Sequence, residues 1–168
     1  ADMRLTEQLH ALLRANAVDL AGNDLAPLCQ AAAEHNVNVV CGMHERDADF
    51  SRSTLYNTVV IIGPDGAVLN RHRKVMPTSP ERMVWGFGDA SGIRAVDTPC
   101  GRVGALLCWE SYLPLARCAR AAAEGQMARA KQLFDGLPAN PGADPDQAFL
   151  RGEIALRILR ACRELGIK

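Results

Sequence analysis

LYNTVVIIGPDGAVLNRHRK, residues 55–74, is the stretch of sequence that decides the fold. Its first part, LYNTVVIIG, is β-branched and almost continuously apolar, which is typical of a strand covered on both faces. The turn signal Pro64-Asp65-Gly66 comes next, and AVLNRHRK follows it. We therefore predict a β-hairpin over residues 55–73 that delivers a basic cluster to one end of a sheet.

Working outward toward the N-terminus, the pattern alternates between helix and strand. VNVVCGM at 37–43 has the same apolar character as the first strand of the hairpin and predicts another strand covered on both faces. Residues 3–15 carry four leucines at helical spacing, and Asp24 is placed to cap a second helix over 25–36. This order of elements predicts an α/β fold.

Toward the C-terminus, residues 77–92 are rich in Pro, Gly, Ser and Thr and predict an ordered loop of the kind that often carries function. A second hairpin is expected next, with IRAVDT, a turn at 99–101, and RVGALLC as its second strand. That strand is expected to end at Cys108, and a helix over YLPLARCARAAAEG to follow it, with Pro114 in its first turn. Cys108 is thus predicted where a buried strand passes into a helix.

The length and the charge of the chain limit the kinds of molecule that it is expected to bind. The chain has 168 residues, which suits one domain with an appendage, and its 19 Lys plus Arg balance 19 Asp plus Glu. Nothing in this charge favours nucleic acid or an anionic membrane, so a small, weakly charged partner is the expectation. No stretch approaches the roughly 18 to 20 apolar residues of a membrane helix, and the N-terminus lacks a secretory pattern, so we expect a cytoplasmic protein.

Six cysteines are scattered along the chain without a C-x-x-C pair or a Cys/His cluster, so neither a disulfide framework nor a metal site is expected. Cys108 differs from the rest by its position at a predicted strand end, where helix amides favour a thiolate. A thiolate that attacks an electrophilic carbon also needs cationic support. Lys74 ends the basic run, and Glu81 stands seven residues later, where it could hydrogen-bond that lysine or a substrate nitrogen.

Two segments, HRKVMPTSPERMVWGFGDASG at 72–92 and DTPCGRVGALLCWESYLPLAR at 97–117, resemble the nitrilase branch of the nitrilase superfamily. The shared motifs are H-R-K-x-x-P-T, then E-R-x-x-W-G-x-G-D, then C-W-E-x-x-x-P-L-A-R. The resemblance covers about residues 20–127. It implies a partial αββα sandwich as the fold, in a truncated domain over 1–127.

The resemblance also implies roles for individual residues. Cys108 would be the nucleophile, Lys74 the cation that stabilises the tetrahedral intermediate, and Glu81 the supporting carboxylate. Trp109 would line the substrate pocket, although plain core packing is an equal alternative, and the Glu110 amide would act as an oxyanion donor. The implied substrate is a small nitrile or amide, a nitrile being converted to a carboxylic acid and ammonia, without a metal or organic cofactor.

Two parts of the family pattern have no counterpart in this sequence. The family places its general base in an F-P-E segment, which is absent here, and residues 128–168 read as a helical hairpin where the family continues into a strand. We expect those helices to cover the sheet or two chains to associate as a homo-oligomer, which sedimentation of a monomer with detached helices would contradict. A catalytically silent fragment that serves in binding or assembly, and an amidase of the same family, remain alternatives.

Overall fold

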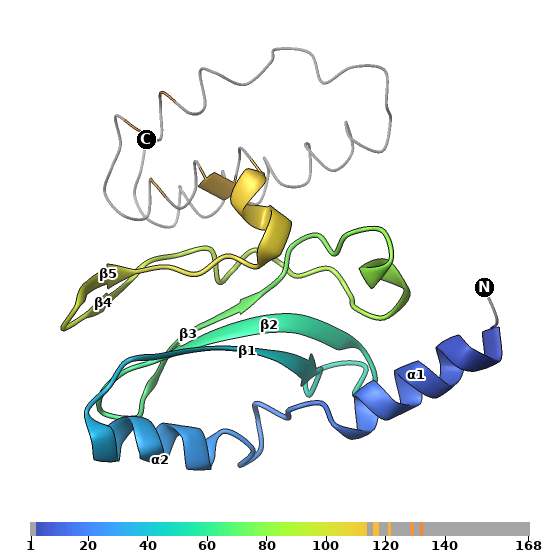
Figure 1. Cartoon of the computed structure of the whole chain (residues 1–168), viewed down its shortest axis with the longest axis horizontal. Coiled ribbons are helices and arrows are strands. Elements are labelled where there is room, and N and C mark those ends of the chain that lie inside the picture. The colour runs from blue at the N-terminus through green and yellow to red at the C-terminus, as the bar shows by residue number, and fades with distance from the viewer. Residues whose placement is uncertain (1–2, 114–115, 118–120, 122–128, 130–131, 133–168) are drawn as a thin grey trace. The chain divides into compact units, whose positions relative to one another are not determined.

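The computed structural model describes residues 3–113, 116–117, 121, 129 and 132 of the chain. It divides into two compact units, Ala1–Gly88 and Asp89–Lys168. The first unit contains α1 (Met3–Ala15), α2 (Ala26–His35), β1 (Val39–Arg46), β2 (Leu55–Ile62), β3 (Val68–Arg73) and the 3-10 helix η1 (Glu81–Met83). The second contains β4 (Val96–Thr98), β5 (Gly101–Val103) and the 3-10 helix η2 (Cys108–Tyr112) (Figure 1). Helices and sheets together confirm the predicted α/β class.

The sheet of the first unit has the order β1-β2-β3, and both pairs are antiparallel. The predicted hairpin is confirmed, with β2 and β3 joined by the expected turn. Gly66 lies at φ +81°, and a Cβ there would approach the carbonyl oxygen of Cys29 to 2.7 Å. The turn therefore needs glycine both for its backbone conformation and for its close approach to α2.

α2 lies along one face of the sheet (Figure 1), and the core of this unit lies between the two. Ala32 on α2 packs with Val60 and Ile62 on the central strand β2. Half-buried apolar side chains surround them: Leu20, Leu25, Leu28, Cys29, Val39, Cys41 and Met43. β2 is thus buried along most of its length, as its continuous apolar run predicts.

The prediction that the strand at 37–43 is covered on both faces is wrong for β1. Its side chains alternate between half-buried and exposed over most of its length, and Val40 is 54% exposed. β1 ends the order of this three-stranded sheet, and α2 covers the face that carries Cys41 and Met43. An edge strand with one covered face alternates in burial even when both of its faces are apolar.

The two helices begin and end close to their predicted bounds, but the predicted cap of α2 is wrong. Leu25 occupies the N-cap of α2 without a side-chain cap bond, whereas Asp24 Oδ2 accepts a hydrogen bond from Asp19 N at 2.8 Å. α2 ends at His35, and its C-cap residue Asn36 takes a left-handed conformation. On α1 a stripe of leucines at helical spacing, Leu5, Leu9 and Leu12, is exposed.

The second hairpin forms, but its strands are short. β5 ends at Val103, five residues before Cys108, so the prediction of a strand that runs to Cys108 is wrong. Val103 pairs with Val96, the first residue of β4. Beyond this pair β4 offers no further backbone partner, so residues 104–107 leave the ladder.

The predicted boundary at 127/128 and the predicted tail helices fall where the structure describes only Arg129 and Gln132. Within the described part of the chain, no helix is long and apolar enough to cross a membrane.

Candidate functional site

The basic run Arg71-His72-Arg73-Lys74 distributes its side chains to the two faces of the sheet. Arg71 pairs with Val60 and Arg73 with Thr58, so both arginines lie on the face that α2 covers. Alternation along a strand sends His72 and Lys74 to the opposite face. The Lys74 backbone is fixed there, since its N–H donates to Asn57 O at 2.8 Å.

Lys74 and Glu81 are brought together within the first unit. The Lys74 side chain has no exposed surface, and its Nζ donates to Glu81 Oε2 at 2.6 Å. The same oxygen accepts hydrogen bonds from Thr78 N at 2.6 Å and Thr78 Oγ1 at 2.8 Å. Burial alone would raise the pKa of Glu81, but the hydrogen bonds from Lys74 and Thr78 outweigh it and lower that pKa. Glu81 is therefore held as a carboxylate.

The segment after η1 closes back on the sheet. Gly86 N donates to Leu55 O, and Gly88 N donates to Lys74 O, both at 2.8 Å. Trp85 stacks on His44 with ring centroids 5.1 Å apart, and its Nε1 donates to His44 Nδ1 at 3.1 Å. These contacts fix the loop that leaves Glu81 against the end of β3.

Cys108 belongs to the second unit, where it is the first residue of η2. Its side chain is exposed, and its φ of 56° lies in the left-handed region that residues other than glycine seldom occupy. The predicted passage from strand to helix is therefore a sharp 3-10 turn. Strained backbone of this kind is concentrated at functional sites.

The two neighbours of Cys108 take different positions. Trp109 is 62% exposed and contacts Tyr112 with ring centroids 5.1 Å apart, so it is not core packing. Glu110 is buried, and its Oε2 accepts from Leu107 N at 2.8 Å while its own N–H donates to Leu107 O at 3.1 Å. Because that amide is engaged within the turn, the oxyanion role of Glu110 stays a prediction.

Two features of the first unit were not singled out from the sequence. The first is Thr78, although the T-x-x-E spacing of Thr78 and Glu81 is a signal that could have found it. The second is a buried charge cluster on the face that α2 covers, where Glu45 accepts from Thr58 Oγ1 at 2.7 Å and from Arg73 Nε at 2.9 Å. The side-chain alternation of the R-H-R-K run is the signal for this cluster.

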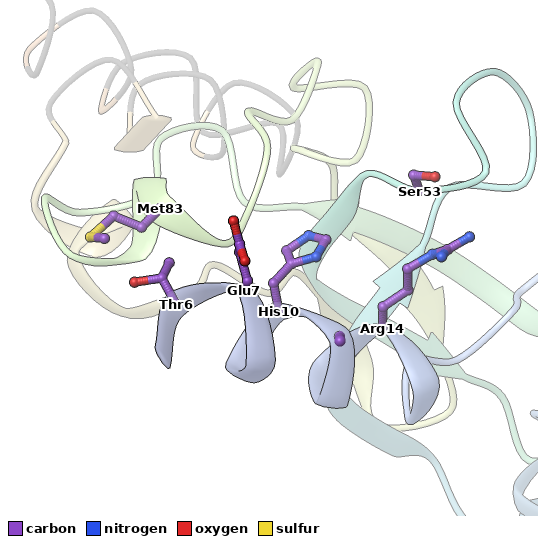
Figure 2. A pocket seen from close by; sticks show the side chains of 7 residues that line it. Thr6, Glu7, His10, Arg14, Ser53 and Met83 are labelled. Carbon is purple, nitrogen blue, oxygen red and sulfur yellow. The ribbon is translucent and has the colours of Figure 1, made fainter. Parts of the chain in front are cut away.

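A cavity of about 520 Å³ lies between α1 and the segments that carry Ser53 and Met83 (Figure 2). Figure 2 shows the side chains of Glu7 and His10 rising from α1 toward it. None of the five predicted site residues lines this cavity. It is therefore separate from the lysine–glutamate pair.

Among the described residues, no group of three or more His, Cys, Asp or Glu is arranged to hold a metal ion. The four cysteines in the described part of the chain, Cys29, Cys41, Cys100 and Cys108, are free thiols.

An α/β protein with a buried lysine–carboxylate pair at a strand end and an exposed cysteine at a strained turn has the groups that nucleophilic hydrolases use. The family model described as carbon-nitrogen hydrolase matches residues 8–133. The chain therefore belongs to the carbon-nitrogen hydrolase family.

Curated relatives place the resemblance in the nitrilase branch of that family. The chain is 45% identical over 105 residues to the bifunctional nitrilase/nitrile hydratase NIT4B of Nicotiana tabacum, covering 62% of this chain and 29% of that protein. It is also 45% identical over 106 residues to an aliphatic nitrilase of Sinorhizobium fredii, covering 63% of this chain and 33% of the relative. A crystal structure of a carbon-nitrogen hydrolase from Helicobacter pylori G27 aligns with a TM-score of 0.49 and 18% identity, covering 68% of this chain and 46% of that one. The chain thus spans about a third or less of the length of these curated relatives.

Proposed function

We propose that this chain carries the catalytic core of a nitrilase, which converts a small nitrile to a carboxylic acid and ammonia with Cys108 as the nucleophile. The observation that supports this most is the buried contact between Lys74 and Glu81, 2.6 Å from Nζ to Oε2. A buried ammonium beside a fixed carboxylate suits a site that stabilises developing negative charge. The family and the named nitrilase relatives agree with this chemistry.

In the proposed reaction, the Cys108 thiolate adds to the nitrile carbon and forms a thioimidate, whose nitrogen takes a proton. Water then adds across the C=N bond, its oxygen to the carbon and one hydrogen to the nitrogen. Transfer of the remaining hydroxyl proton to the nitrogen breaks the C–N bond, so that ammonia leaves and a thioester remains. A second water cleaves the resulting thioester and releases the acid and the thiolate, so one nitrile and two waters give one acid and one ammonia. We assign Lys74 to the negative charge of the tetrahedral intermediate and Glu81 to the orientation of Lys74 or of a substrate nitrogen.

The proton acceptor is the part of this mechanism that the sequence does not supply. No F-P-E segment is present among the 168 residues, and Glu7 and Glu34 lie within helices. Removal of a general base from a site of this kind costs about 10² to 10⁴ in rate.

Labelling with iodoacetamide tests whether the proposed site assembles. We expect Cys108 to react faster than the other five cysteines, and Lys74→Met to slow that reaction about tenfold, which corresponds to ~1.4 kcal/mol of lost thiolate stabilisation. Arg71→Met is the matched control, since it removes a cation from the opposite face of the sheet. Equal reactivity of all six cysteines would favour the alternative of a silent fragment that serves in binding or assembly.

Ammonia release separates nitrile hydrolysis from amide hydrolysis. A nitrile and the amide with the same side chain are compared, each with the wild-type chain and with Cys108→Ala. We expect ammonia from the nitrile to exceed that from the amide, and the Cys108→Ala variant to release none from either. The reverse order of the two substrates would indicate an amidase.

A further inference from the structure

One oxygen of the Glu81 carboxylate accepts three hydrogen bonds. Oε2 accepts from Lys74 Nζ at 2.6 Å, from Thr78 N at 2.6 Å and from Thr78 Oγ1 at 2.8 Å. Two of these three donors come from a single residue. Thr78 therefore holds the Glu81 carboxylate with both its backbone N–H and its side-chain hydroxyl.

The local sequence explains only part of this arrangement. Thr78 and Glu81 have the T-x-x-E spacing of a helix capping box, in which the carboxylate accepts from the backbone N–H of the first residue. The N-cap of η1 itself is Pro80, but Arg82 N donates to Thr78 O at 3.1 Å, so Thr78 begins the hydrogen-bonded turn that precedes η1. In an ordinary capping box, however, the threonine hydroxyl accepts from the amide of the third residue, whereas the hydroxyl of Thr78 donates to the Glu81 carboxylate.

The extra donor matters because of what Lys74 requires. The Lys74 side chain is fully buried, so its ammonium depends on a carboxylate at a fixed position. The Glu81 side chain is 21% exposed and has three rotatable torsions, which would let an untethered carboxylate turn toward water. The two donors of Thr78 oppose that movement.

We propose that Thr78 is a positioning residue that holds the Glu81 carboxylate ionised and in contact with Lys74; this inference rests on the proposed function for its catalytic meaning. An ammonium has three N–H donors. With one of them on Glu81 Oε2, the carboxylate fixes the direction of the Lys74 ammonium. Thr78 thereby sets the direction in which Lys74 presents its charge without touching the reacting atoms.

The first test needs no variant. In the 168-residue chain, the amide proton of Thr78 and the side-chain carboxyl carbon of Glu81 are followed by NMR as the pH is lowered. The proposal expects both signals to titrate with one midpoint, because the amide bonds the group that takes up the proton. Independent behaviour of the two signals would overturn it.

Three variants then isolate the hydroxyl. Thr78→Val keeps the backbone N–H and the shape of the side chain but removes the hydroxyl, Thr78→Ser restores it, and Ser79→Ala controls for the turn. We expect the pKa of Glu81 to rise in Thr78→Val and to stay near its wild-type position in Thr78→Ser and Ser79→Ala. A Thr78→Val chain that folds and keeps the wild-type pKa of Glu81 would contradict the proposal.

A parallel measurement distinguishes failure of this inference from failure of the proposed function. The rate of iodoacetamide labelling at Cys108 is determined for the same variants. A change in the pKa of Glu81 with slower labelling supports both proposals. A change in that pKa with unaltered labelling supports the positioning role alone and counts against the assembly of Cys108 with the lysine–glutamate pair.

Discussion

Gly88 lies where the chain leaves no room for a side chain. A Cβ at this position would stand 2.7 Å from the carbonyl carbon of Arg73, and backbone atoms cannot yield as the end of a flexible side chain can. We expect Gly88→Ala to destabilise the chain by about 1 to 3 kcal/mol and to loosen the contact of the loop with Lys74.

Gly42→Ala is the matched control for this prediction. Gly42 is exposed on β1, and a Cβ there would meet nothing within 4 Å. That substitution should be neutral or stabilise the chain by up to about 1 kcal/mol, because it removes conformational freedom from the unfolded chain. Urea unfolding of both variants measures the difference, and equal effects would show that close packing at Gly88 is unimportant.

The position of a site residue could be predicted best where its contacts are with residues close to it in the sequence. Lys74 and Glu81 are seven residues apart and joined by one turn, so sequence motifs are enough to nominate them together. The left-handed conformation of Cys108 could not be predicted, because no residue type other than glycine signals a positive φ strongly. Nor could the inward fold of Glu110 onto Leu107, since a glutamate beside a proposed nucleophile suggests an outward role.

Among the strands, β3 is held by a buried ion pair with β1 as well as by its backbone pairing with β2. Glu45 is almost fully buried and bonds the guanidinium of Arg73, whose side chain is 12% exposed. We expect Arg73→Met to destabilise the chain by roughly 3 kcal/mol, because it leaves the Glu45 carboxylate buried without its main partner.

Two further variants test the origin of that loss. Glu45→Gln combined with Arg73→Met should cost less than the sum of the two single substitutions, as measured by urea unfolding. Arg102→Met removes a cation from an exposed ion pair with Asp97 and should change stability by less than about 1 kcal/mol. Additive single effects would show that the two side chains do not interact in the folded chain.

The elements themselves were predictable where the pattern and the pairing agree. The hairpin of β2 and β3 follows from a continuous apolar run and from a turn in which a glycine takes the position with positive φ. The length of β5 was not predictable, because the apolar character of GALLC does not show where the pairing with β4 stops, which is at Val96 and Val103. The one-sided burial of β1 likewise depends on its place at the end of the strand order.

At the scale of the whole molecule, two carboxyl groups in the described part of the chain, those of Asp47 and Glu81, link stability to acid because their pKa values are lowered in the folded state. The backbone amide of Ser51 contributes most to the lowered pKa of Asp47, and burial opposes it; the pKa of Glu81 is lowered as well, despite burial. The folded chain thus binds these protons more weakly than the unfolded chain does. Their stabilisation is fully present above the ordinary carboxyl pKa of about 4 and is lost as the pH falls through the folded values.

We therefore expect the urea midpoint to be flat near neutral pH and to fall below about pH 4. Asp47→Asn should reduce that acid dependence, because it removes one of the two carboxyl groups with a lowered pKa. A midpoint that stays constant down to pH 3 in the wild-type chain would contradict the prediction.

The chain as a whole presents apolar surface that bears on its assembly. Leu5, Leu9 and Leu12 are exposed along α1, and homo-oligomer formation remains a prediction that sedimentation tests. The sequence does not determine which surface a second chain would use, since contacts between chains leave no periodic signal of their own.

The register of the β2–β3 hairpin decides which cation does which task. Arg73 serves the ion pair with Glu45 on one face, and Lys74, its neighbour, meets Glu81 on the other. A slip of one residue, such as an insertion into the Pro64–Gly66 turn would impose, would bring Arg73 to the place of Lys74 and His72 to the place of Arg73, so that a guanidinium replaces the ammonium beside Glu81 and Glu45 loses its partner. The number of residues in the Pro64–Gly66 turn thus determines which side chain reaches the site at the far end of β3.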